Sequence, residues 1–142
     1  MAAQIVHDAV LAAASELSTE GGEVSIVLTD DLTIAKLNCD WRGIDKPTNV
    51  LSFPASDHKA HEEARLLGDI VIAYQTLERE CADENRPFLH HLAHLTVHGF
   101  LHLRGYDHQT DRQAEEMEAL ESKIMSRLNM PDHYFERDLG VV

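Results

Sequence analysis

The segment 87–103 limits the possible folds more than any other part of the chain. Its apolar residues occupy almost the whole circumference of a helix: Phe88, Leu89, Leu92, Leu95, Val97 and Leu101. A helix that is apolar nearly all round has no solvent-facing side and must be buried. We therefore predict a central helix here, packed against a sheet. Pro87 fits its first turn, where the N–H that proline lacks would be unpaired anyway.

The rest of the chain alternates between helical and strand-like patterns. Apolar spacing predicts further helices over 4–17 and 74–82. It also predicts a helix that is capped by Asp30 and ends before Lys46, and a last helix that starts at Thr110. Strands are predicted over 23–28, 49–53 and 68–73. The strand over 68–73 is apolar almost throughout, which predicts burial on both faces. This order indicates an α+β fold: a single small domain over 1–142, with one mixed β-sheet and helices packed around it.

Composition limits the class of protein. A chain of 142 residues with 44% hydrophobic residues suits one domain with a substantial core. No apolar run approaches the ~20 residues of a membrane span. No basic region followed by an apolar segment marks a secretory signal at the N-terminus. Cys39 and Cys81 form no disulfide framework. We therefore expect a cytoplasmic protein with reduced thiols and no membrane partner.

Three histidines mark the end of the predicted central helix. His98 and His102 are one helical turn apart, so their side chains leave the same face with Cβ atoms about 5–6 Å apart. Gly105 suits the positive φ that ends a helix, so the chain can turn back and bring His108 alongside. Three nitrogen ligands and an open fourth position are typical of catalytic zinc. We predict one Zn²⁺ per chain, bound by His98, His102 and His108.

The histidine spacing also matches the ligand frame of metzincin proteases, with one difference. Those proteases carry a glutamate general base directly after the first histidine, and Gly99 occupies that position here. This difference argues against a metzincin-like peptidase. A metal-dependent hydrolase of another bond, including a peptide bond, stays an alternative because it would use the same three ligands.

The other histidines and the acidic run after the motif are expected to have supporting or surface roles. His94 is interpreted as a histidine that packs in the core or contacts a ligand. Surface positions are predicted for His7, His58, His61, His90, His91 and His133. The acidic run is interpreted as a solvated helix face and comprises Glu115, Glu116, Glu118 and Glu121.

The sequence around the histidines resembles the signature of the YbeY family of bacterial metal-dependent endoribonucleases, which act in ribosomal RNA maturation. Three stretches carry the resemblance: HGFLHLRGYDH over 98–108, PTNVLSFP over 47–54 and LGDIVI over 67–72. The similarity extends over about residues 24–128. There are two departures. The family usually has aspartate where this chain has Asn49, and it usually begins with a strand, whereas this chain is expected to start almost directly in a helix.

The resemblance implies a zinc-dependent, single-strand-specific endoribonuclease acting in 16S ribosomal RNA maturation and ribosome quality control. Its implied partners are ribosomal RNA or ribosomal particles. The family also carries a functional arginine shortly before the Pro47-Thr48 stretch, and by position this catalytic role falls on Arg42. Arginine suits the role because it is permanently charged and binds two phosphate oxygens. A surface arginine in an ion pair is the alternative. Asp107 is either a partner of a ligand histidine or a turn residue.

The formal net charge of -13 argues against a broad basic surface for nucleic acid. It is compatible with an RNA substrate, because a local cationic cleft with a metal ion can act while the far face stays acidic. A non-enzymatic ribosome-assembly or RNA-binding factor, in which zinc only braces the fold, also stays an alternative. The sequence contains no indication of oligomeric state.

Overall fold

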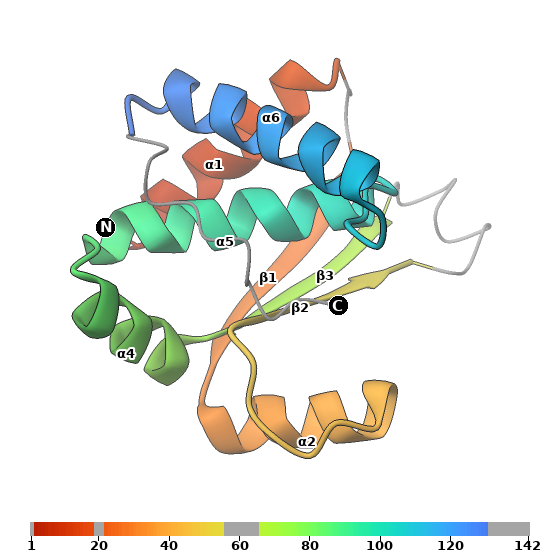
Figure 1. The fold of residues 1–142 in the computed structure, drawn as a ribbon, viewed down its shortest axis with the longest axis vertical. Helices are drawn as coiled ribbons and strands as arrows, with labels where there is room; N and C mark the ends of the chain where they lie inside the picture. The colour runs from red at the N-terminus through yellow and green to blue at the C-terminus, as the bar shows by residue number, and fades with distance from the viewer. Residues whose placement is uncertain (1, 19–21, 56–65, 131–142) are drawn as a thin grey trace.

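The computed structural model describes residues 2–18, 22–55 and 66–130, arranged as Figure 1 shows. The elements follow the predicted order: α1 (Ala2–Glu16), β1 (Glu23–Thr29), α2 (Asp31–Arg42), β2 (Val50–Pro54), β3 (Leu66–Ala73), α4 (Tyr74–Glu84), α5 (Phe88–Leu103) and α6 (Asp111–Arg127). The predicted α+β class is confirmed. No helix in this described part of the chain combines the length and apolar character needed to cross a membrane.

The three strands form one mixed sheet with β3 at its centre, in the order β1-β3-β2. β1 runs parallel to β3, and β2 runs antiparallel to it. Alternate residues of β3 pack on opposite faces, as the pleat of a strand requires. Ile70 and Ile72 belong to the main core, whereas Val71 and Ala73 belong to a smaller core that includes Ile34 of α2. The predicted burial of this strand on both faces is confirmed.

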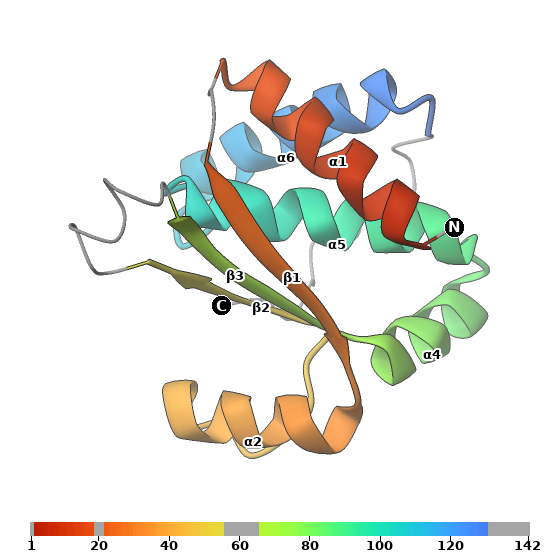
Figure 2. The ribbon, with the colours of Figure 1, turned by 180° about the vertical axis from the view of Figure 1, so that it is seen from behind.

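The helix α5 lies across one face of the sheet together with α1 and α6, while α2 covers the opposite face (Figure 1 and Figure 2). Residues 91–101 of α5 are all buried, as its apolar circumference predicts. The helix contacts α1, α4, α6, β2 and β3. Pro87 is the N-cap of α5, one position before the predicted place in its first turn. Contact on all sides makes α5 a rigid support for the side chains near its C-terminal end.

Both ends of the loop between α5 and α6 have defined local structure. Gly105 has a φ of 97°, so the chain turns where the sequence predicts the end of the helix. The predicted capping box begins α6: the hydroxyl of Thr110 accepts from the backbone N–H of Gln113 at 3.1 Å, and Oε1 of Gln113 accepts from the N–H of Thr110 at 3.2 Å. The loop that carries His108 is therefore fixed on both sides.

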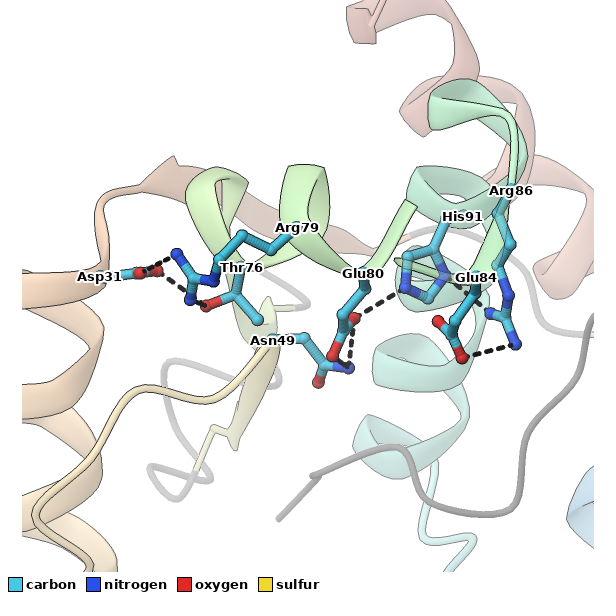
Figure 3. A network of polar contacts seen from close by, with 8 residues as sticks. All are labelled: Asp31, Asn49, Thr76, Arg79, Glu80, Glu84, Arg86 and His91. Carbon is cyan, nitrogen blue, oxygen red and sulfur yellow. Dashed lines mark hydrogen bonds and ion pairs between the residues drawn. The ribbon is translucent and has the colours of Figure 1, made fainter. Parts of the chain in front are cut away.

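A partly buried polar network joins α4, the N-terminal part of α5 and the start of β2 (Figure 3). Glu80 lies at its centre, where Oε1 accepts from Nε2 of His91 at 2.8 Å and from Nδ2 of Asn49 at 3.2 Å. Arg86 donates to Nδ1 of His91 at 3.1 Å, so Nε2 of His91 carries the hydrogen that bonds to Glu80. The predicted surface position of His91 is wrong, because its side chain is 2% exposed. An aspartate in place of Asn49 would put a second carboxylate beside Glu80, so the amide suits this network.

Glu80 makes part of the folding free energy depend on pH. Burial acts to raise its pKa, but hydrogen bonds from His91 and Asn49 outweigh burial and lower the pKa below its ordinary value of 4.5. A carboxyl group whose pKa is lower in the folded state stabilises the fold above the unfolded-state pKa. That stability is lost as pH falls through the folded-state value. We expect Glu80→Gln to lower the free energy of unfolding by about 1–3 kcal/mol at neutral pH. The difference from wild type should shrink as pH falls below about 4.5.

Urea unfolding followed by circular dichroism over this pH range measures the effect. Glu78→Gln is the matched control, since Glu78 lies exposed on the same helix and loses the same charge. Its unfolding curve should stay close to that of wild type at every pH. A difference between Glu80→Gln and wild type that stays constant down to about pH 3 would contradict the role of the ionised carboxylate.

Candidate metal centre

The end of α5 and the following loop bring the three predicted ligands together. Nε2 of His98 lies 3.2 Å from Nε2 of His102. One ring nitrogen from each of His98, His102 and His108 can be chosen so that all three lie within 4.8 Å of one another. The ring centroid of His108 is 5.7 Å from that of His98 and 5.3 Å from that of His102. The turn at Gly105 thus returns the chain to the helix end.

The donor set fits a small divalent ion that favours imidazole. Zinc–nitrogen bonds of about 2.0–2.1 Å at tetrahedral angles place two ligand nitrogens about 3.3 Å apart. The nitrogens of His98 and His102 are separated by 3.2 Å, close to that edge length. Nε2 of His108 is buried and has no hydrogen-bond partner. A buried polar atom without a partner costs free energy, and binding an ion would remove that cost.

The surroundings of His102 keep its imidazole neutral. Burial lowers its pKa, the nearby imidazoles of His98 and His108 lower it further, and the resulting pKa is about 4. A neutral imidazole retains the lone pair that coordination requires. At neutral pH, His102 is therefore already in the protonation state that binds a metal.

Glu121 of α6 is a residue of this centre that the sequence analysis placed wrongly. Its side chain is 3% exposed instead of facing solvent. One carboxylate oxygen contacts Nδ1 of His98, and the other accepts from Nε2 of His94 at 3.3 Å. A signal for this burial was present, because Glu121 follows Met117 by four residues and precedes Ile124 by three. These spacings place it on the apolar stripe of the helix.

The two histidines keep the Glu121 carboxylate ionised. Burial acts to raise its pKa, but the hydrogen bonds with His94 and His98 outweigh burial and lower the pKa to about 2. A buried anion is tolerated when hydrogen-bond donors surround it. His94 is itself 2% exposed. This agrees with the predicted role for His94 of packing in the core or contacting a ligand.

Gly99 lets α5 approach the sheet closely and leaves no room for a general base. A Cβ atom on Gly99 would lie 2.9 Å from Cγ2 of Ile70 and 3.1 Å from Oγ of Ser52. Ser52 also donates a hydrogen bond from Oγ to the carbonyl oxygen of Gly99 at 3.1 Å. A side chain at this position would point into the sheet and away from the histidines. The glutamate of metzincin proteases has no equivalent place here.

Arg42 is the last residue of α2, on the face of the sheet opposite α5 (Figure 1). Its Nη1 donates to Oδ1 of Asn38 at 3.2 Å. Among residues 2–18, 22–55 and 66–130, no hydrogen bond links Arg42 to the three histidines. The structure therefore keeps Arg42 outside the histidine cluster. Because Asn38 is a neutral amide, this contact leaves the guanidinium charge uncompensated.

The remaining predicted residues are Asp107 and the histidines expected at the surface. Asp107 is a turn residue, since its Oδ1 accepts from the backbone N–H of His108 at 2.8 Å. His7 is exposed on α1, as predicted. Three other histidines lie outside the described residues: His58, His61 and His133.

Comparison with known proteins identifies the family. The family model described as "Endoribonuclease YbeY" matches residues 1–129. A protein named Endoribonuclease YbeY from Bradyrhizobium sp. is 55% identical over 143 residues, which is 96% of this chain and 85% of the relative. A protein of the same name from Nitrobacter hamburgensis is 58% identical over 136 residues, covering 92% and 72% respectively.

A solved structure has the same fold. The solution structure of TM1509 from Thermotoga maritima superposes with a TM-score of 0.56 at 24% sequence identity, covering 89% of this chain and 82% of that one. The resemblance drawn from three short stretches is confirmed by the match over nearly the whole chain. The chain belongs to the YbeY endoribonuclease family.

Proposed function

We propose that the chain is a zinc-dependent endoribonuclease that cleaves single-stranded RNA, with His98, His102 and His108 as the metal ligands. The observation that carries the proposal is the convergence of three imidazole nitrogens, two of them 3.2 Å apart. The relatives named Endoribonuclease YbeY support RNA as the substrate. We extend the proposal to 16S ribosomal RNA maturation and ribosome quality control in the cytoplasm, on ribosomal particles.

The chain's own residues divide the work of phosphodiester cleavage. When bound, zinc would supply an activated water molecule and would polarise a phosphoryl oxygen. His98, His102 and His108 would hold the ion through one ring nitrogen each. Arg42 stabilises negative charge on the phosphate, with a guanidinium that Asn38 orients without neutralising it. Gly99 has no side chain that could act as a general base.

The acidic composition of the chain restricts how RNA is held. A chain with a formal net charge of -13 repels phosphate groups overall. Affinity then depends on local contacts at the metal and at individual cations such as Arg42. A flexible single strand can make such contacts with fewer phosphates near acidic surface than a rigid duplex can.

Removal and return of metal test this function. The purified protein should cleave a single-stranded RNA and leave a duplex of the same sequence largely intact. Chelation should abolish cleavage, and added zinc should restore it, because the activated water depends on the ion. Electrophoresis of end-labelled RNA provides the measurement. If protein carrying one metal ion per chain cleaves neither RNA, the enzyme assignment is wrong and a ribosome-assembly factor with structural zinc becomes the better explanation.

A further inference from the structure

We propose that Glu121 is a positioning residue that holds His98 in the tautomer presenting Nε2 to the metal, while His94 holds Glu121 in place. The inference rests on the proposed metal site and adds the group that orients one of its ligands. It draws on contacts between α5 and α6, which cannot be deduced from the residue spacing of the histidine motif.

The tautomer of His98 follows from the chemistry of its partner. An ionised carboxylate only accepts hydrogen bonds, so the ring nitrogens that face it must carry hydrogen. Nδ1 of His98 contacts one oxygen of Glu121, and Nε2 of His94 contacts the other. A neutral imidazole has a single N–H, so hydrogen on Nδ1 leaves the lone pair of His98 on Nε2. That nitrogen is the one lying 3.2 Å from Nε2 of His102.

His94 provides a second contact for the Glu121 carboxylate, in addition to the contact with His98. It lies one turn before His98 on α5, with ring centroids 6.5 Å apart. One carboxylate from α6 therefore bridges two successive turns of α5 and uses both of its oxygens. A carboxylate bound at both oxygens cannot rotate freely, so the ring of His98 is held in one orientation.

Burial removes the alternative partners that would weaken this arrangement. Glu121 is 3% exposed, and its neighbours on the inner stripe of α6, Met117 and Ile124, are buried and apolar. Water is largely excluded from the carboxylate, so the two imidazoles are its available donors. In metal sites of this kind, loss of the carboxylate that orients a ligand histidine typically weakens metal binding by about 10–100-fold.

Glu121→Gln tests the inference with almost no change of shape. A glutamine has one accepting oxygen and one donating nitrogen, so it cannot accept from both histidines. We expect the Kd for zinc, measured by competition with a chelating dye, to rise by about 10–100-fold. Long-range ¹H–¹⁵N NMR of the metal-free protein should show His98 as the Nδ1–H tautomer in wild type, with that state depleted in the variant. Glu115→Gln removes the same charge from an exposed position on the same helix and should change neither readout.

The two readouts separate this inference from the proposed function. An Nε2–H tautomer of His98 in wild type would overturn the positioning role, even if Glu121→Gln failed to fold. A folded Glu121→Gln with unchanged tautomer and unchanged zinc affinity would overturn it as well. A wild type that binds no zinc but shows the Nδ1–H tautomer would instead refute the metal site and leave the Glu121 contact standing. Thermal unfolding of each variant shows whether stability alone has changed.

Discussion

His98→Ala is expected to lower the zinc content from about one ion per chain to less than about 0.1, because two imidazoles do not form a tight zinc site. RNA cleavage should disappear with the metal. The substitution also leaves the buried Glu121 carboxylate with one donor fewer. The free energy of unfolding should therefore fall by about 1–3 kcal/mol, the cost of an unsatisfied buried group. Elemental analysis of dialysed protein measures the zinc content, and thermal unfolding measures the change in stability.

Two further variants make the result specific. His102→Ala removes a ligand that does not contact Glu121, so it should lose zinc with a smaller loss of stability. His7→Ala removes an exposed histidine on α1 and should keep the full complement of metal. Equal zinc content in His98→Ala and His7→Ala would refute His98 as a zinc ligand.

Arg42→Ala is expected to lower the rate of RNA cleavage by roughly 10²–10³, the scale seen when one charge-stabilising donor is lost. Zinc content should not change, and stability should change little, because Arg42 is half-buried and makes its hydrogen bond to Asn38 only one turn away. Arg42→Lys should recover part of the activity, since an ammonium group cannot bind two phosphate oxygens as a guanidinium does. Single-turnover cleavage of a labelled RNA measures the rates.

Lys36→Ala is the matched control, because Lys36 is an exposed cation on the same helix and its side chain is 78% exposed. Its cleavage rate should stay near that of wild type. Loss of zinc and fold together in Arg42→Ala would make Arg42 a structural residue. Unchanged cleavage would refute the catalytic role of Arg42. The stabilisation of phosphate charge would then be assigned to another cation, such as Lys46 or Arg104. Because α2 and α5 lie on opposite faces of the sheet, an active Arg42 also requires the bound RNA to reach both faces.

The fold was predictable wherever a pattern stays within one element. The apolar circumference of 87–103 predicts the central helix, and the capping box at Thr110 predicts where α6 begins. Continuous apolar character predicts that β3 is buried on both faces. These signals are local, so they do not depend on how the elements pack together.

The parts of the site that sequence analysis missed depend on contacts between elements. Glu121 is 23 residues from His98, and Glu80 is 11 residues from His91. A buried carboxylate or imidazole is stable only with its partner, and that partner lies on another helix. The charge of such residues therefore favours a solvent-facing position in a sequence-based prediction, even though the spacing of Glu121 places it on the apolar stripe of α6. Likewise, chain topology determines on which face of the sheet Arg42 lies. The residues next to Arg42 in sequence do not determine it.

The contact between Gly99 and β3 has a consequence for how this scaffold can evolve. The metzincin ligand frame and this one differ at a single position in sequence, which suggests an easy exchange of peptidase and nuclease chemistry. A Cβ atom at position 99 would lie 2.9 Å from Cγ2 of Ile70, so any side chain there would collide with the sheet. A mutational path to the protease base would first have to move α5 away from β3 and open the main core. Two proteins can thus share a metal-binding motif and still be separated by a packing barrier.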